Sequence, residues 1–330
     1  MIRRLLSKAT ICTLSITLLI SGTLFADTHK LQLKDDSQSL IFQLGDKPLL
    51  AYHYGMAKVP EGIDPIFSRS GFIHPLWSPN GHALTQIQPS DHYHHYGIWN
   101  PWTKIEYQGQ TLDFWNLGEG QGTVKFERIL NKTVSAEYAQ LTALHQHLQF
   151  LPDGVQKPIL NEQQRIRIYT PTEADKYIVD IAIRLTAVDA NVTLKQHRYG
   201  GFSWRATELW NESNSRVLTS EGKTRANADN SSGRWFLIDG ELQNDYAGML
   251  VMSHPSNVHH PEPLRIWPLG YNEQGQVFAN FATTKNQDWV IKLGEVYYLN
   301  YRLVVYNQQL SDKQAESYWQ DFASVKALNK

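Results

Sequence analysis

The sequence predicts an all-β fold, a large antiparallel β-sandwich with one C-terminal helix. Three features of the 330-residue chain support this prediction. Apolar and polar residues alternate in several separate runs, which is the pattern of strands that bury one face. Turn sequences containing Pro, Asp, Asn and Gly separate these runs. Apolar residues recur at helical spacing in one stretch near the C-terminus.

The clearest strand pattern lies between Lys176 and Val188. Its core-facing side is expected to consist of Tyr177, Val179, Ile181, Ile183 and Leu185. Its other side is only partly polar and carries Asp180, Arg184 and Thr186 beside Ile178 and Ala182. Similar alternation recurs at residues 164–170, 246–252 and 297–306, with turns expected at residues 152–154 and 272–275. This succession of strands and turns is typical of a sandwich of antiparallel sheets.

The single predicted helix follows Ser311. Ser311 and Gln314 have the spacing of a capping box, in which each side chain bonds a free backbone amide at the helix start. An apolar stripe then runs through Ala315, Tyr318, Trp319, Phe322 and Val325. We expect this helix to cover a face or an edge of a sheet, and we assign it no chemistry.

The first 26 residues have the features of a signal peptide. Arg3, Arg4 and Lys8 precede the apolar segment 9–25, and Ala26 provides a cleavage point. We therefore expect an exported protein, periplasmic or secreted. No linker, charge block or repeat marks a boundary in the remainder, so residues 27–330 are expected to form a single β-sandwich domain.

The composition of the mature chain excludes several classes of function. The only cysteine, Cys12, lies in the predicted signal peptide, so disulfides, a cysteine nucleophile and thiolate metal sites are all excluded. Loss of the leader removes three basic residues and changes the net charge from −1 to −4. The sequence has no basic stripe for a nucleic-acid partner. It has no further apolar segment long enough for a membrane span, so we expect neither kind of partner after leader removal.

The strongest candidate for a functional site is the heptad Asp91-His92-Tyr93-His94-His95-Tyr96-Gly97. It contains three imidazoles and two phenols. Six of the thirteen histidines lie between His53 and His95. Core packing does not require such a density, because a buried imidazole must find hydrogen-bond partners. The heptad therefore indicates chemistry without naming the reaction.

Three interpretations of the heptad are open. If it is a strand, His92 and His94 share one face and could bind a divalent metal, which is the cofactor that the sequence suggests, while His95 points away. Without a metal, His94 or His95 could act as a general base. Tyr93 or Tyr96 would then serve as the proton donor. In the third interpretation these side chains only form hydrogen bonds within a loop.

Two further segments contain residues suited to binding. Residues 197–205 follow the clearest strand and hold Arg198 and Arg205 around a Gly-Gly pair. Arginine binds a carboxylate or sulfate through its planar fork, and the glycines let the backbone approach a ligand. A kinked strand with surface arginines is the alternative. Residues 254–257, with Arg265 nearby, suit a loop at a strand end.

The aromatic residues give a hint about the substrate. Four tryptophans fall within 39 residues, interspersed with short polar side chains: Trp77, Trp99, Trp102 and Trp115, with Asn100, Asn116 and Glu119. This mixture suits sugar rings, whose C–H faces pack on indole while their hydroxyls form hydrogen bonds. Since most tryptophans are core residues, we expect only one or two of the four to contact a ligand.

Five blocks of the sequence resemble, in the same order, blocks of the PmoA-like domain family of unknown function, which is also labelled methane oxygenase. These blocks are residues 69–75, 91–97, 113–115, 197–201 and 252–257. The resemblance covers most of the mature chain and implies a β-sandwich protein that acts on carbohydrate. The chain departs from the family pattern within the heptad, where Tyr93 replaces Pro and Tyr96 replaces Arg.

The resemblance also implies an enzyme that dehydrates terminal uronic acids of ulvan-type oligosaccharides. In this elimination a base takes the C5 proton, an acid protonates the departing C4 hydroxyl, and a cationic group neutralises the carboxylate. The expected catalytic residues are His94, His95, Tyr96 and Tyr199. The expected substrate contacts are Arg69, Trp99, Trp102, Asn116, Glu119, His197, Arg198, Arg205, His254 and Asn257.

Two other functions remain possible from the sequence. A glycoside hydrolase needs two carboxylates across the scissile bond, and Asp91, Asp113 and Glu119 are available. The other alternative is a periplasmic sugar-binding protein without catalysis. Both share with the elimination hypothesis an oligosaccharide as the bound partner.

Overall fold

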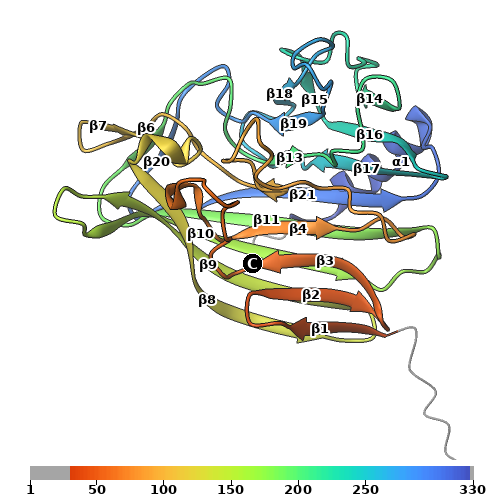
Figure 1. Cartoon of the computed structure of the whole chain (residues 1–330), viewed down its shortest axis with the longest axis horizontal. Coiled ribbons are helices and arrows are strands. Elements are labelled where there is room, and N and C mark those ends of the chain that lie inside the picture. The colour runs from red at the N-terminus through yellow and green to blue at the C-terminus, as the bar shows by residue number, and fades with distance from the viewer. Residues whose placement is uncertain (1–29, 328–330) are drawn as a thin grey trace, which may run out of the picture.

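The computed structural model of the chain describes residues 30–327, and its strands form three antiparallel sheets (Figure 1). The largest sheet has nine strands. Their spatial order is β1 (Leu31–Asp35), β2 (Ser39–Leu44), β3 (Lys47–His53), β4 (Phe72–Leu76), β5 (Ile98–Trp99), β13 (Ser203–Arg205), β19 (Phe278–Phe281), β18 (Glu262–Ile266) and β15 (Ser232–Gly233).

The second sheet has eight strands in the order β14 (Ser215–Thr219), β16 (Trp235–Leu242), β17 (Asp245–Ser253), β21 (Tyr297–Tyr306), β11 (Lys176–Ala187), β10 (Gln156–Tyr169), β9 (Tyr138–Phe150) and β8 (Gly122–Val134). A small third sheet consists of β20 (Trp289–Ile291), β12 (Val192–Leu194), β6 (Ile105–Tyr107) and β7 (Gln110–Leu112). Two 3-10 helices lie in loops, η1 (Pro65–Phe67) and η2 (Leu117–Glu119). In Figure 1 strands β1 to β3 lie in front of the second sheet, which confirms the predicted sandwich.

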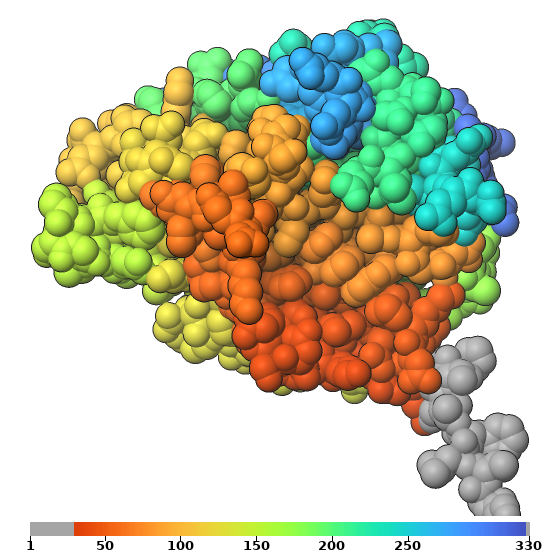
Figure 2. All heavy atoms as spheres, in the orientation of Figure 1, coloured from red at the N-terminus to blue at the C-terminus, as the bar shows by residue number. Residues whose placement is uncertain are grey.

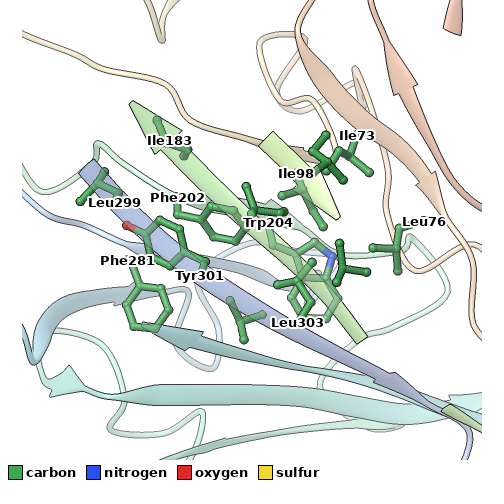
Figure 3. Packing of buried hydrophobic residues seen from close by; sticks show 14 of the residues in the cluster. Ile73, Leu76, Ile98, Ile183, Phe202, Trp204, Phe281, Leu299, Tyr301 and Leu303 are labelled. Atoms are coloured by element: carbon green, nitrogen blue, oxygen red, sulfur yellow. The ribbon is translucent and has the colours of Figure 1, made fainter. Parts of the chain in front are cut away.

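The main core lies between the two large sheets. The five apolar side chains predicted to face inward from β11 are all at most 2% exposed and belong to this core. The nine-stranded sheet supplies Ile73, Ile98 and Trp204 from the opposite side (Figure 3). The predicted strands at residues 164–170, 246–252 and 297–306 lie within β10, β17 and β21, apart from Thr170, which follows β10. The alternation of apolar residues therefore located the core correctly.

The outer face of the nine-stranded sheet carries a second group of large side chains. Because side chains alternate along a strand, the neighbours of Ile98 and Trp204 in sequence, Trp99 and Arg205, point away from the main core. The antiparallel register places Arg205 opposite Phe278. The backbone N–H of Trp267 donates to the carbonyl of Phe278, so the chain just after β18 lies beside this pair. This outer face is where the histidine heptad packs.

The C-terminal helix α1 (Asp312–Ser324) forms as predicted. Ser311 is its N-cap, and both bonds of the capping box with Gln314 are present. Ala315 and Phe322 are buried against apolar residues of β16, β17 and β21, so α1 covers the outer face of the eight-stranded sheet. The predicted stripe is one residue too long, because Val325 follows the helix in extended conformation and is 44% exposed.

Replacement of Ser311 by alanine is expected to lower the free energy of unfolding by about 1 kcal/mol. The change removes the hydroxyl that accepts a hydrogen bond from the Gln314 amide at 3.3 Å. Urea unfolding followed by circular dichroism measures the effect. Ser317→Ala is the matched control, since Ser317 lies on the exposed side of the same helix. Equal losses in the two variants would contradict a capping role.

The predicted signal peptide, residues 1–26, lies outside the described residues. Export and the single domain over residues 27–330 stay predictions. Within residues 30–327 no helix is both long and apolar enough to cross a membrane.

Candidate functional site

The heptad from Asp91 to Gly97 is not a strand, and the alternation expected for one is wrong. Its backbone makes two successive turns, in which the His92 amide bonds the Pro89 carbonyl and the His95 amide bonds the His92 carbonyl. Tight turns of this kind curl the chain, so side chains that would alternate in a strand converge. The structure therefore brings all three imidazoles together.

The three imidazoles contact one another. The rings of His92 and His95 are stacked with centroids 4.6 Å apart. His94 meets both edge-on, at 5.4 Å from His92 and 4.9 Å from His95. His95 is 2% exposed and also packs on Phe278, whereas His92 and His94 are half-buried. A substrate can reach His92 and His94 but not His95.

Asp91 links this histidine cluster to the sheet. Both of its carboxylate oxygens accept hydrogen bonds from Arg205 Nη2 at 3.0 Å, and one lies 2.9 Å from His92 Nδ1. Burial alone would raise the pKa of Asp91, but the contacts with His92 and Arg205 outweigh it and lower the pKa to about 2. Asp91 is therefore a carboxylate at neutral pH. Its negative charge favours a proton on the nearby Nδ1 of His92, which makes no hydrogen bond of regular geometry, and Nε2 is then the acceptor.

The other two imidazoles are neutral at physiological pH. Burial lowers the pKa of His94 to about 4, and the nearby His92 adds to the effect. Burial also lowers the pKa of His95 far below its ordinary value, with His94 and Arg205 contributing. The cluster thus offers unprotonated ring nitrogens beside a guanidinium that is itself neutralised by Asp91.

A layer of buried aromatic rings supports the histidines from below. It comprises Phe72, Tyr96, Trp99, Trp115, Trp267 and Phe278, each at most 3% exposed. Trp267 stacks toward His92 at 5.0 Å between centroids, and its ring also lies 4.8 Å from the Arg205 guanidinium carbon. These rings fix the cluster in place, because well-packed neighbours leave a side chain few alternative rotamers.

Tyr199 lies on the same face and is joined to the cluster through Trp267. Its hydroxyl accepts hydrogen bonds from Trp267 Nε1 at 3.2 Å and Arg265 Nη2 at 3.1 Å, and it meets the Tyr271 hydroxyl at 3.0 Å. Burial raises the pKa of Tyr199, and the Tyr271 contact adds to this, while Arg265 acts in the opposite direction. Tyr199 is therefore a protonated phenol at neutral pH.

Cationic side chains surround Tyr199. Arg265 donates to Asp229 at 2.6 Å and lies 5.1 Å from the Tyr199 ring. Arg198 is exposed, with its guanidinium carbon 5.2 Å from the same ring. Burial lowers the pKa of Lys285, with Asp229 opposing this and Arg265 and Arg198 reinforcing it. Three cations near one carboxylate give this end of the site a net positive charge.

The sequence profile of a family described as a family of unknown function, DUF6807, matches residues 39–320. The chain belongs to DUF6807. The predicted resemblance to a family of unknown function is confirmed to this extent, and its PmoA-like name and carbohydrate link stay predictions. No curated protein matches the sequence.

Solved structures share only a distant likeness with this DUF6807 chain. A heparan sulfate lyase HepC mutant from Pedobacter heparinus aligns at 8% identity and a TM-score of 0.39, over 86% of this chain and 37% of that one. The chain thus spans little more than a third of the lyase. YeaD from Salmonella typhimurium, a mutarotase candidate, aligns at 10% identity and a TM-score of 0.45, over 84% of this chain and 94% of that one. Slr1438 from Synechocystis sp. PCC 6803 has 10% identity and a TM-score of 0.35, over 90% and 100% of the two chains.

Several residues expected at the site of this DUF6807 protein lie beneath it. Tyr96 is 0% exposed, and its hydroxyl donates to the Phe67 carbonyl and accepts from Gln88. Trp99 and Trp102 are 1% exposed, and Arg69 is 2% exposed. These four side chains have no open surface for a substrate and do not line the site. Tyr96 and Trp99 belong to the aromatic layer beneath it, whereas Trp102 belongs to the main core.

Other expected contacts are spread around the rim. The amides of Asn116 bond the Asp113 carboxylate, which also accepts from the Trp115 amide, so Asp113 and Asn116 stabilise a turn. Glu119 is exposed in η2. His197 Nδ1 lies 2.8 Å from the Thr103 hydroxyl. None of these side chains contacts the histidine cluster through a recorded hydrogen bond or ring contact.

The structure does not bring His254 and Asn257 to the histidine cluster. His254 packs against Phe322 of α1 and its Nε2 lies 3.0 Å from the Val325 carbonyl. Asn257 is buried and bonds Glu262 and the backbone of Asn300. Since α1 covers the eight-stranded sheet, this part of the chain faces away from the heptad.

Sequence reasoning missed two groups of residues. Trp267 and Tyr271 were not considered, and Arg265 was noted only as a neighbour. Arg265 and Trp267 are two residues apart at the end of β18, a spacing that places both side chains on the same face of the sheet. A buried polar cluster on β9 and β10 was also missed. There the Glu162 carboxylate accepts from Asn100 at 3.1 Å, meets His147 Nε2 at 3.0 Å, and lies 3.8 Å from His145.

The divalent metal expected at His92 and His94 stays a prediction. Among residues 30–327, no three His, Cys, Asp or Glu side chains are arranged to hold a metal ion. The one carboxylate beside His92 is already paired with Arg205. The reaction proposed for this site uses only side chains of the chain.

Proposed function

We propose that this protein is an exported carbohydrate-active enzyme that eliminates water from terminal uronic acids of polysaccharide-derived oligosaccharides of the ulvan type, which makes it a carbon–oxygen lyase. The observation that carries the proposal is the arrangement around Trp267. This indole contacts His92 at 5.0 Å between centroids and bonds the Tyr199 hydroxyl at 3.2 Å. It thus joins an accessible base, a protonated phenol and a cationic cluster on one face.

Each requirement of the elimination has a candidate side chain. The imidazole of His92 takes the C5 proton, and the C5–H electron pair forms the C4=C5 double bond as the C4–O bond breaks. The Tyr199 phenol supplies the proton with which the hydroxyl leaves as water. Arg265 and Arg198 bind the carboxylate and stabilise the negative charge that develops beside C5. Proton transfer from His92 back to Tyr199 through solvent restores both groups.

His92 is a better base here than His94 or His95. Asp91 lies 2.9 Å from its Nδ1 and stabilises the imidazolium that forms when Nε2 accepts a proton. His94 has a pKa of about 4, which makes it a weak base at neutral pH. His95 is buried. The catalytic roles expected for His94 and His95 therefore become the positioning of His92. Of the two expected acids, Tyr96 and Tyr199, we assign the role to Tyr199.

The proposal is tested by mixing purified mature protein with uronate-terminated oligosaccharides and following the ultraviolet absorbance of a conjugated unsaturated uronate. We expect absorbance to rise without new reducing ends, since dehydration leaves the glycosidic bonds intact. Because no step uses a metal, the rate is expected to be the same with a chelator. New reducing ends on a flat trace would indicate a glycoside hydrolase, and a flat trace with bound sugar would indicate a binding protein. Either result would overturn the proposal.

A further inference from the structure

A hollow lies beside the histidine cluster on the outer face of the nine-stranded sheet. It has a volume of about 680 Å³ and is lined by residues 82–83, 85–90 and 207–209, together with His74, Gln274 and Gln276. In Figure 2 the orange, green and blue surfaces of these three parts of the chain adjoin one another. Neither the proposed reaction nor the expected substrate contacts make use of this cavity.

The lining of the cavity is rich in uncharged hydrogen-bonding groups. Four glutamines, Gln86, Gln88, Gln274 and Gln276, line it together with Thr207. Three of these amides also bond within the protein, since Nε2 of Gln86 donates to Glu208, that of Gln88 to Tyr96 and that of Gln276 to Gln274. Amides both donate and accept, which suits hydroxyl groups that do the same. Ile87 and Leu209 add apolar surface, and Leu209 is 45% exposed. Polar groups around a small apolar area are the features of a sugar site.

The charge of this cavity differs from the positive charge of the side chains around Tyr199. Glu208 is the only Asp, Glu, Lys or Arg among the described residues that line it. Burial lowers the pKa of His74 to about 4, so that imidazole is neutral at physiological pH. A carboxylate or sulfate would find no cationic arginine or lysine here, and Glu208 would repel it. The cavity therefore selects for uncharged ligands.

The cavity and the histidine cluster share a wall. Gln276 and Gln86 line the cavity, and their side-chain oxygens both accept hydrogen bonds from Arg205. Arg205 in turn bonds Asp91, which lies against His92. One buried guanidinium thus separates the proposed base from the cavity.

We infer that this cavity is a subsite for a neutral sugar. It holds the sugar next to the uronic acid, an assignment that rests on the proposed function. The preferred substrate is then an oligosaccharide of mixed charge, with the terminal uronate between the histidines and the arginines around Tyr199 and an uncharged sugar among the glutamines. Glu208 and Gln274 bind hydroxyl groups of that sugar.

The inference is tested by binding without turnover. Isotope-labelled mature protein is titrated with the methyl glycosides of galactose, xylose and rhamnose, and with methyl glucuronide, while amide resonances are followed by NMR. We expect at least one neutral glycoside to bind. Glu208→Gln should weaken it about 10-fold, as for a hydrogen bond with a charged partner, and Gln274→Ala about 2- to 10-fold, as for a neutral one. Methyl glucuronide is expected to bind both variants as it binds the wild type. Gln320→Ala, on the exposed side of α1, is the matched control.

The outcomes separate this inference from the proposed reaction. Failure of all three neutral glycosides to bind, or equal binding by the wild type and both cavity variants, would overturn the neutral subsite. Neutral-sugar binding that the variants weaken, in a protein that eliminates water from no uronate, would support the subsite and overturn the proposed function. Resonance spectra of each variant that match the wild type outside the cavity show that the variant is folded.

Discussion

Replacement of His92 by alanine is expected to lower turnover of a uronate substrate by about 10²- to 10⁴-fold, the range that a positioned general base contributes. The loss arises because the variant retains Asp91 but has no imidazole to take the C5 proton. His92 is half-buried in a turn, so its removal leaves the main core intact. The initial rate of ultraviolet absorbance gain, measured at saturating substrate, reports the effect on kcat.

Two further measurements separate a base from a structural residue. Free imidazole added to His92→Ala is expected to restore part of the rate, because a diffusing base can occupy the vacated space. Tyr93→Phe is the matched control in the same turns, since it keeps the ring that packs against Phe67 and removes only a phenol. A fully active His92→Ala protein, with activity lost in His94→Ala instead, would show that His94 is the base.

The fold could be predicted from the sequence because its signals are local. Alternation along residues 176–188 reports which face is buried, whatever that face packs against. The Ser311 capping box likewise depends on neighbours three residues apart. Sheet order depends on pairing between distant segments, such as β5 with β13, and a pattern within one strand does not specify its partner.

The sequence indicated the segment of the candidate site but did not predict how its side chains are arranged. The density of histidines marked the segment whose three imidazoles meet in the structure, yet the strand interpretation separated His95 from His92. Their convergence depends on Arg205, which holds Asp91 from 114 residues away. Tyr96 was expected to be a catalytic acid for a related reason. The sequence around a tyrosine does not show whether its hydroxyl faces solvent or, as here, bonds the Phe67 carbonyl.

The buried polar cluster gave no recognisable signal. His145 and His147 lie two residues apart on β9, a spacing that any strand with one polar side could show. Only the register of β9 with β10, which pairs His145 with Glu162, reveals that these groups meet inside the sandwich. Their role in stability can be tested directly.

Glu162→Gln is expected to lower the free energy of unfolding by about 3–5 kcal/mol, the range for breaking a buried ionic network by removing one charge. Glu162 is 2% exposed, and the atoms around it on Asn100, Gln164 and His147 are donors or ring nitrogens. A glutamine amide would point its own N–H groups at these donors. Urea unfolding at pH 7 measures the change. Glu127→Gln on β8 is the matched control, because that side chain is 45% exposed and its loss should change stability by less than about 0.5 kcal/mol.

The effect of Glu162 on stability is expected to depend on pH with a definite sign. Burial alone would raise the pKa of Glu162, but His145 and His147 outweigh it and hold the pKa far below its ordinary value of 4.5. The folded state therefore binds this proton more weakly than the unfolded state does. The stabilisation is fully present above pH 4.5. It is lost as the pH falls from the pKa of Glu162 in the unfolded state toward its lower pKa in the folded state. The part of the difference in unfolding free energy between the wild type and Glu162→Gln that comes from ionisation of this carboxylate should thus shrink below about pH 5. A difference that grew in acid would mean that Glu162 is protonated in the folded protein and that the cluster is not ionic.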